Sequence, residues 1–184
     1  MSSSPSSTQA RIVVVGAGSI GGFVAFELAR AGHDVTLCVR SPFERLVVID
    51  EHGQRHERVL PILTDPADVA EADWVILATK AHQTEAAAQW LRNACGPSTQ
   101  GVVVMQNGVE HEARVRPYVG AVPVLPCIVR CGAEAIAPGT SFITASLVSK
   151  CPAAPSRLPW VRCSQRRHSS SWPSTTSPRS RGRN

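Results

Sequence analysis

A glycine-rich turn near the start of the chain constrains the fold more than any other feature. Residues 16–21 read Gly-Ala-Gly-Ser-Ile-Gly, which matches the pattern G-x-G-x-x-G. An apolar, β-branched run precedes the turn at residues 11–15, and apolar residues at helical spacing follow it over residues 23–31. A second β-branched run at residues 34–39 completes a unit of strand, helix and parallel strand. A glycine turn in this context predicts a Rossmann-type, dinucleotide-binding fold.

The three glycines of the turn have different expected roles. Gly16 permits the turn, Gly18 lets a pyrophosphate approach the backbone, and Gly21 lets the helix pack closely on the strand. Backbone N–H groups at the start of the helix would bind the phosphates. The candidate pyrophosphate site is therefore the whole turn: Gly16, Ala17, Gly18, Ser19, Ile20 and Gly21. The alternative is a glycine turn with a structural role only.

The remaining apolar pattern alternates between short strands and helices. Extended runs at residues 46–50 and 56–62 flank a turn, which predicts a hairpin. Further strands are predicted at residues 73–79, 101–105, 122–129 and 140–148, and helices at residues 81–94 and 110–118. This order predicts an α/β fold with a doubly wound, mainly parallel sheet over residues 11–148.

Arg40 stands at the end of the second predicted strand, the position that usually selects between NAD and NADP. An acidic residue there accepts hydrogen bonds from the ribose 2′-hydroxyl and repels a 2′-phosphate. A guanidinium instead binds phosphate through two hydrogen bonds, and Ser41 adds a hydroxyl donor. The sequence therefore predicts NADPH as the cofactor, with a solvated surface arginine as the alternative.

Polar residues also follow two later strands. Lys80 comes directly after the strand at residues 73–79, and Asn107 follows the strand at residues 101–105. Ligands of open α/β sheets bind beyond the carboxyl ends of the strands, so both residues are expected in the crevice beside the glycine turn. Lys80 would contact an anionic substrate or the cofactor ribose, and the Asn107 amide would lie near the nicotinamide. The alternatives are a helix-starting lysine and an Asn-Gly turn.

Several other classes of site and environment have no support in the sequence. The chain has no G-x-S-x-G motif, no Cys-x-x-Cys pair and no histidine cluster at metal-ligand spacing, so neither a serine hydrolase nor a metal site is predicted. The six cysteines are expected to be reduced thiols. No apolar run approaches the roughly 20 residues of a membrane-spanning helix, and no secretory signal is apparent, so a soluble cytoplasmic protein is expected.

The two ends of the chain differ in composition from the predicted domain. Residues 1–10 are rich in serine and are expected to form a disordered leader, and residues 149–184 a disordered tail. Residues 151–184 hold seven arginines and no acidic residue, whereas residues 1–150 hold 12 basic and 14 acidic residues. A nucleic-acid partner is therefore not expected for the domain. The tail is either a basic arm or, as we favour, a departure from the ancestral reading frame.

These residues together resemble the ketopantoate reductase family, also called the 2-dehydropantoate 2-reductases. The resemblance covers roughly residues 11–148 and rests on five segments: Gly16–Gly22, Arg40, Lys80-Ala81-His82-Gln83, Gln106-Asn107-Gly108-Val109 and Ala137-Pro138-Gly139. It implies NADPH-dependent reduction of the keto group of 2-dehydropantoate to pantoate, in pantothenate biosynthesis.

The resemblance also implies roles for single residues. Residues 16–21 would bind the pyrophosphate, Arg40 the 2′-phosphate, and Lys80 and Asn107 would line the cofactor and substrate site. Ala135 would contact the cofactor through its backbone. The family has a second, helical domain that carries the general-acid lysine, and no residue of this chain matches it, so no catalytic residue is assigned.

Three functional interpretations therefore stay open. The chain is a 2-dehydropantoate reductase or the cofactor-binding half of one, a catalytically inactive truncated nucleotide-binding module, or the front half of another NADP-dependent hydroxyacid dehydrogenase. The surface that a second domain would cover is expected to be apolar and exposed, which predicts self-association.

Overall fold

The computed structural model describes residues 9–130, 132–144 and 148–150. Except for positions 9–10 and 149–150, the predicted leader and tail lie outside the described residues. The strands are β1 (Arg11–Val15), β2 (Asp34–Cys38), β3 (Leu46–Ile49), β4 (Arg55–Arg58), β5 (Ile62–Leu63), β6 (Trp74–Leu77), β7 (Gly101–Val104), β8 (Val124–Pro126), β9 (Ile128–Arg130), β10 (Ala133–Ala137), β11 (Thr140–Ile143) and β12 (Val148–Lys150). The α-helices are α1 (Ser19–Arg30), α2 (Ala88–Ala94) and α3 (His111–Val119).

A six-stranded sheet with the order β5-β2-β1-β6-β7-β8 organises the fold. All of its neighbouring strands run parallel, and Val14 in β1 lies between Leu37 in β2 and Ile76 in β6. The chain moves outward from β1 to β5 and then crosses back to place β6 on the other side of β1. The strand order therefore reverses between β1 and β6, which confirms the predicted doubly wound, Rossmann-like sheet.

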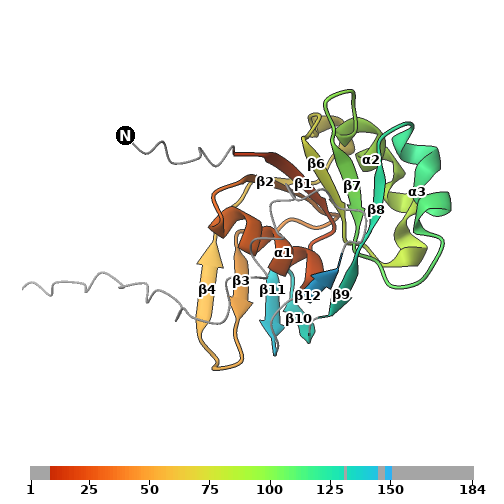
Figure 1. The fold of residues 1–184 in the computed structure, drawn as a ribbon. Coiled ribbons are helices and arrows are strands. Elements are labelled where there is room, and N and C mark those ends of the chain that lie inside the picture. The colour runs from red at the N-terminus through yellow and green to blue at the C-terminus, as the bar shows by residue number, and fades with distance from the viewer. Residues whose placement is uncertain (1–8, 131, 145–147, 151–184) are drawn as a thin grey trace, which may run out of the picture.

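The two faces of this sheet are covered by different elements (Figure 1). Side chains alternate along each strand, so Ile12 and Val14 of β1 pack toward α1, while Val13 and Val15 pack toward α2 and α3. Residues of β6 and β7 alternate in the same way. These strands are buried on both faces, which explains why their sequences read as unbroken apolar runs.

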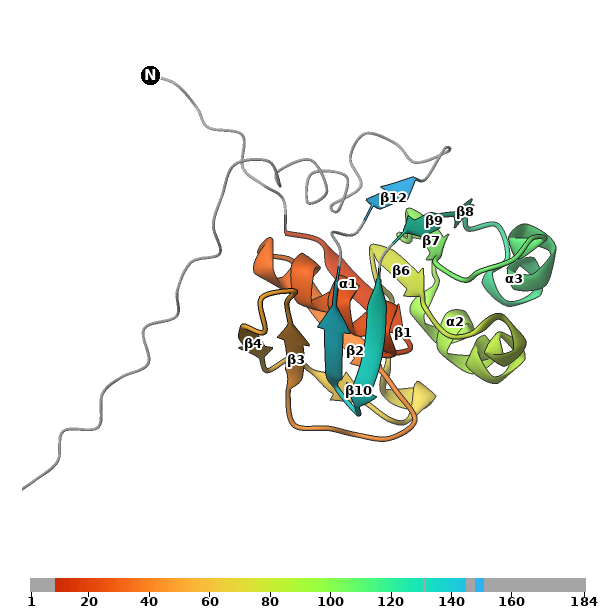
Figure 2. The same cartoon turned by 90° about the horizontal axis from the view of Figure 1, so that it is seen from below.

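A second sheet of four strands, in the order β10-β11-β3-β4, packs against the side of α1 that faces away from the six-stranded sheet (Figure 2). Helix α1 contacts β1 and β2 of the first sheet and β3, β10 and β11 of the second. Residues 21–28 of the helix are all buried as a result. The sequence predicted the antiparallel β3–β4 hairpin of this sheet, and the structure confirms it. It did not predict the parallel pairing of β3 with β11, which opposes Val48 to Ser141.

Several predicted elements differ in detail from the structure. The run predicted at residues 56–62 is divided between β4 and β5, and the strand predicted at residues 140–148 contains β11 and the first residue of β12. The helix predicted at residues 81–94 consists of 3-10 turns at Ala81–Gln83 and Glu85–Ala87, followed by α2. The strand predicted at residues 122–129 is divided into β8, which pairs with β7, and β9, which pairs with β12. Helix α1 begins at Ser19, inside the stretch predicted as a glycine turn.

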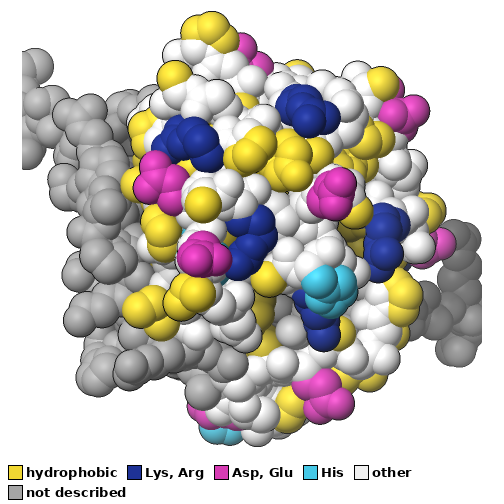
Figure 3. Space-filling view, turned by 90° about the vertical axis from the view of Figure 1, so that its right-hand side faces the viewer, with side chains coloured by type: hydrophobic (Ala, Val, Ile, Leu, Met, Phe, Trp, Pro, Cys, Tyr) yellow, Lys and Arg dark blue, Asp and Glu magenta, His cyan; other side chains and the backbone are white. Residues whose placement is uncertain are grey.

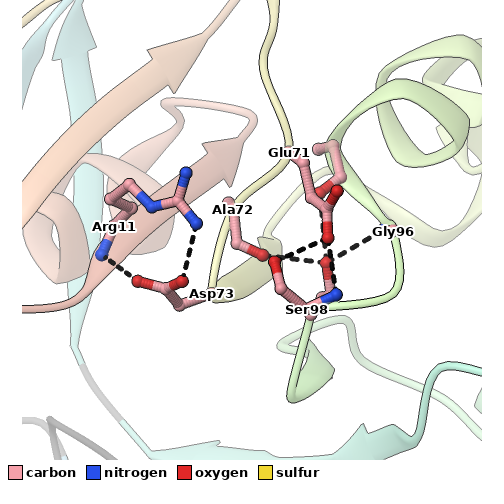
Figure 4. Close-up of polar contacts among 8 residues, drawn as sticks. Arg11, Glu71, Ala72, Asp73, Gly96 and Ser98 are labelled. Atoms are coloured by element: carbon pink, nitrogen blue, oxygen red, sulfur yellow. Dashed lines mark hydrogen bonds and ion pairs between the residues drawn. The ribbon is translucent and has the colours of Figure 1, made fainter.

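Polar side chains link the amino ends of β1, β6 and β7 (Figure 4). The Arg11 guanidinium and backbone N–H donate to the Asp73 carboxylate at 2.9 and 2.8 Å. The Ser98 backbone N–H and hydroxyl each donate to Glu71 Oε1 at 2.6 Å. The buried Thr99 hydroxyl donates to the Ala72 carbonyl at 2.8 Å. The amino edge of the sheet is therefore closed by contacts within the chain.

The cysteine prediction holds only in part. Cys38 and Cys95 are free, and burial raises the pKa of each thiol to about 12. Cys127 is disulfide-bonded, so the prediction of reduced thiols is wrong at that position. Among the described residues, no helix has the length and apolar character needed to cross a membrane.

Candidate dinucleotide-binding site

The candidate residues follow the carboxyl ends of four neighbouring strands. The glycine turn follows β1, Arg40 follows β2, Lys80 follows β6 and Asn107 follows β7. These strands are parallel neighbours, so their carboxyl ends lie at one edge of the sheet. The edge includes the switch point between β1 and β6, where ligands of open α/β sheets bind.

The geometry of the turn separates the roles of its glycines. Gly16 has a φ of +96°, and a Cβ there would lie 2.9 Å from Thr79 Cγ2. A Cβ on Gly21 would collide with the Gly16 carbonyl oxygen and lie 2.9 Å from Ala78 Cβ. A Cβ on Gly18 would have no neighbour within 4 Å. The first and third glycines therefore serve close packing, and the second faces open space.

The start of α1 has the features of an anion-binding site. Gly18 is the N-cap, so no side chain caps the helix, and the first turn contains no acidic residue. The unpaired amides at a helix start carry partial positive charge that favours a bound phosphate. The open space at Gly18 adjoins these amides, so the residues present fit a dinucleotide pyrophosphate.

Two arginines flank the loop that leaves β2, and their surroundings differ. Arg45 donates to Glu57 at 2.9 Å, and Glu57 also accepts from Arg55 at 2.6 Å. Arg40 is exposed and forms no ion pair within the described part of the chain. Of these two arginines, only Arg45 has a carboxylate partner among the described residues.

The second sheet braces the same loop, a contact that the sequence did not predict. Gly139 lies in the β10–β11 turn with a φ of +71°, and a Cβ there would lie 2.5 Å from the Phe43 ring and 2.8 Å from the Arg45 carbonyl oxygen. The Val47 N–H donates to the Gly139 carbonyl at 2.7 Å. This close approach gives a structural reason for a glycine in the Ala137-Pro138-Gly139 segment.

Lys80 and Asn107 are both exposed at the edge, and each begins a turn. Lys80 precedes the 3-10 turn at Ala81–Gln83, where the Lys80 N–H donates to Gln83 Oε1 at 3.4 Å and the Gln83 N–H donates to the Lys80 carbonyl at 2.8 Å. The Lys-x-x-Gln spacing therefore closes this turn. Asn107 precedes Gly108, whose φ is +113°. The structure places both residues at the start of a turn, and their predicted contacts with cofactor and substrate stay predictions.

Gln106 is a polar residue of this edge that the sequence interpretation did not assign to the site by itself. Gln106 is only 5% exposed and is separated from the apolar strand β7 by Met105 alone. The Gln106 Nε2 donates to Thr79 Oγ1 at 3.1 Å and to Thr84 Oγ1 at 3.0 Å. The signal available in the sequence was a polar residue extending an apolar strand immediately before Asn107.

Ala135 belongs to a strand and not to one of the loops that follow the parallel strands. It is exposed on β10, an outer strand of the second sheet, where it pairs with Ser141 beside a register shift. Its predicted backbone contact with the cofactor stays a prediction. No cluster of three or more potential metal ligands occurs among the described residues.

Figure 3 shows the face on the right-hand side of Figure 1, where α3 lies. Basic, acidic and apolar side chains are interspersed across it. This face does not present the continuous basic surface that nucleic-acid binding uses.

Comparisons with known proteins identify the family. The family model described as ketopantoate reductase PanE/ApbA matches residues 12–151. A 2-dehydropantoate 2-reductase of Caulobacter vibrioides is 40% identical over 132 residues, which cover 70% of this chain and 44% of the relative. A 2-dehydropantoate 2-reductase of Mycobacterium tuberculosis is 38% identical over 124 residues, which cover 67% of this chain and 42% of the relative. This chain therefore spans less than half the length of these curated relatives.

Solved structures agree with this assignment. The 2-dehydropantoate 2-reductase from Methylococcus capsulatus matches with a TM-score of 0.67 and 25% identity over 76% of this chain and 47% of its own. A D-mandelate dehydrogenase in ternary complex with NADH and anilino(oxo)acetate matches with a TM-score of 0.67 and 26% identity, over the same shares of the two chains. The chain belongs to the ketopantoate reductase PanE/ApbA family.

Proposed function

We propose that this chain is the NADPH-binding part of a reductase that converts 2-dehydropantoate to pantoate. One observation carries the proposal: the glycine turn, Arg40, Lys80 and Asn107 follow four adjacent parallel strands at the switch-point edge of one sheet. The names of the curated relatives support the substrate.

The chain would hold the dinucleotide across this edge. The amides at the start of α1 bind the pyrophosphate, and the open space at Gly18 admits it. Arg40 contacts the 2′-phosphate of the adenosine half, over β2. The nicotinamide half then lies over β6 and β7, beside Lys80 and Asn107. When bound, NADPH supplies a hydride for the keto carbon of the substrate.

Lys80 and Asn107 suit a ketoacid substrate. The Lys80 ammonium is a donor with a positive charge for a carboxylate or a ribose hydroxyl, and the Asn107 amide both donates and accepts. Neither side chain is buried, so both are accessible to a ligand. We assign the general acid to no residue of this chain, because no described residue matches the role that the family gives to a lysine of another domain.

A second candidate is a dehydrogenase for another 2-hydroxyacid. The similarity to the D-mandelate dehydrogenase bound to NADH favours it, because that structure shares the fold with a different substrate and cofactor. The identity of Arg40 favours NADPH over NADH for this chain.

Equilibrium binding and turnover separate the three interpretations. The fluorescence of NADPH and of NADH is titrated with the full chain, and oxidation of NADPH is then followed with 2-dehydropantoate and with an aryl 2-ketoacid. Turnover of 2-dehydropantoate supports the reductase, and faster turnover of the aryl ketoacid supports the second candidate. NADPH binding without turnover is the result expected for a cofactor-binding part alone, whether it belongs to a reductase or is an inactive nucleotide-binding module. Absence of binding to both NADPH and NADH contradicts all three.

The cofactor preference tests the role of Arg40. Replacing Arg40→Asp removes the phosphate ligand and adds a repelling charge, so we expect the preference for NADPH over NADH to fall by about 10- to 100-fold. Arg45→Ala is the matched control, because Arg45 already binds Glu57. An unchanged preference in Arg40→Asp would show that the 2′-phosphate binds elsewhere.

A further inference from the structure

Gln106 occupies an unusual position for an amide side chain. It closely follows β7, whose four residues are all buried and apolar or glycine, and is itself almost completely buried. Thr84, its nearest polar neighbour, is only 2% exposed. A leucine would fill a similar volume at this place without burying polar atoms, so packing alone does not explain the glutamine.

The hydrogen bonds of Gln106 connect segments that are distant in the sequence. Its Nε2 donates to Thr79 Oγ1 at 3.1 Å and to Thr84 Oγ1 at 3.0 Å, with the Lys80 carbonyl at 3.4 Å. The Thr84 hydroxyl in turn donates to the Ala81 carbonyl at 2.8 Å. One amide group therefore fixes the end of the β6 loop and the turn that follows Lys80.

The same contacts reach the glycine turn. Thr79 forms the wall against which Gly16 packs, since a Cβ on Gly16 would lie 3.0 Å from the Thr79 backbone nitrogen. Gln106 also immediately precedes Asn107. The two exposed polar residues of the nicotinamide side, Lys80 and Asn107, are thus attached to one buried hydrogen-bond network.

We propose that Gln106 is a positioning residue that sets the backbone of Lys80 and Asn107 for the nicotinamide half of the cofactor. This inference rests on the proposed function. Polar groups that orient a ligand must be held within a fraction of an ångström, and a buried network on strand ends provides such support. The adenosine half lies over β2, outside the reach of this network.

The proposal predicts that loss of the Gln106 side chain weakens binding of the nicotinamide half of the cofactor and not of the adenosine half. Dissociation constants are measured for NADPH and for 2′,5′-ADP, which contains the 2′-phosphoadenosine half and no nicotinamide. The variant Gln106→Leu removes the hydrogen bonds at nearly constant volume. Thr99→Val is the matched control, because Thr99 is a buried hydroxyl that bonds Ala72 and Gly96 at the opposite edge of the sheet.

We expect Gln106→Leu to raise the dissociation constant for NADPH by about 10-fold, the effect of about one lost hydrogen bond. The constant for 2′,5′-ADP should change by less than about twofold, within the range of measured effects at distant sites. Thr99→Val should lower the melting temperature without changing either constant. If Gln106→Leu does not fold, Thr84→Val removes one partner of the amide, and a smaller change in the same direction is expected.

Two results would overturn the inference while leaving the proposed function intact. In one, Gln106→Leu or Thr84→Val binds NADPH as tightly as the unmodified chain. In the other, the variants lose NADPH and 2′,5′-ADP binding in equal proportion, as a general loss of structure would produce. Failure of the unmodified chain to bind either ligand overturns the proposed function itself, and this inference with it.

Discussion

The three glycines of the first turn show how much a single residue can determine. Gly16 and Gly21 leave no room for a side chain, whereas a Cβ added at Gly18 would meet no atom of the described chain within 4 Å. Gly18 has φ −68° and ψ −170°, a conformation that alanine also adopts. The fold alone therefore does not require glycine at position 18, and a bound pyrophosphate gives a reason for it.

The pair Gly18→Ala and Gly21→Ala separates binding from folding. We expect Gly18→Ala to keep its melting temperature and to bind NADPH at least about 10-fold more weakly, because its methyl group lies where the pyrophosphate approaches. Gly21→Ala should lower the free energy of unfolding by about 1–3 kcal/mol, the usual cost of overpacking. Thermal unfolding and NADPH titration measure both. Undiminished NADPH affinity in Gly18→Ala would contradict the role given to Gly18.

At the residue scale, the sequence predicted positions better than contacts. The edge placement of Arg40, Lys80 and Asn107 followed from the ends of three apolar strands, because parallel strands fix where their successors lie. The contact of Phe43 with Gly139 could not be predicted, because it joins a loop and a turn that are distant in the sequence. The hydrogen bonds of Gln106 could not be predicted either, because the burial of a polar side chain depends on tertiary packing.

At the scale of elements, α1 explains which parts of the fold were predictable. Its sequence is apolar on nearly every side, which is typical of a helix buried on all sides. That pattern indicates two covering layers but does not identify the second one. The covering strands β3 and β11 are far apart in the chain, and pairing between distant strands has no local signal. A continuous helix was predicted at residues 81–94, but its first part consists of 3-10 turns. The hydroxyl of Thr84 and the side-chain amide of Gln83 form hydrogen bonds that favour these tight turns.

The ion pair that joins β1 to β6 makes a prediction about acid stability. Hydrogen bonds from the Arg11 guanidinium lower the pKa of Asp73 below its ordinary value of 3.8, against the opposing effect of burial. A lowered pKa in the folded state means that the carboxylate stabilises the fold above the unfolded pKa, and that this contribution disappears as the pH falls through the folded pKa.

We therefore expect Asp73→Asn to be less stable than the unmodified chain at pH 7. The difference between the urea midpoints of the two proteins should begin to shrink below about pH 4, where the carboxylate becomes protonated in the unfolded state, and should disappear only below the folded pKa. Asp68→Asn is the control, since Asp68 is exposed and forms no ion pair among the described residues. A difference between Asp73→Asn and the unmodified chain that stays constant from pH 7 to pH 3 would contradict this role.

At the scale of the whole molecule, the two edges of the main sheet have different characters. The amino edge is closed by two hydrogen-bonded pairs, Arg11 with Asp73 and Ser98 with Glu71 (Figure 4). The carboxyl edge leaves Gly18, Arg40, Lys80 and Asn107 accessible. Val109 and Ile128, which follow β7 and β8, are 73% and 58% exposed. The predicted self-association through an apolar face stays a prediction.

Amide hydrogen exchange with and without NADPH locates the binding edge directly. We expect NADPH to slow exchange in the loops after β1, β2, β6 and β7, at residues 16–22, 40–45, 79–84 and 106–109. Exchange at residues 50–54 and 96–100 should not change, because these segments lie in the β3–β4 turn and at the amino edge. Slower exchange at residues 96–100, with no change at residues 16–22, would contradict a cofactor site at the carboxyl edge.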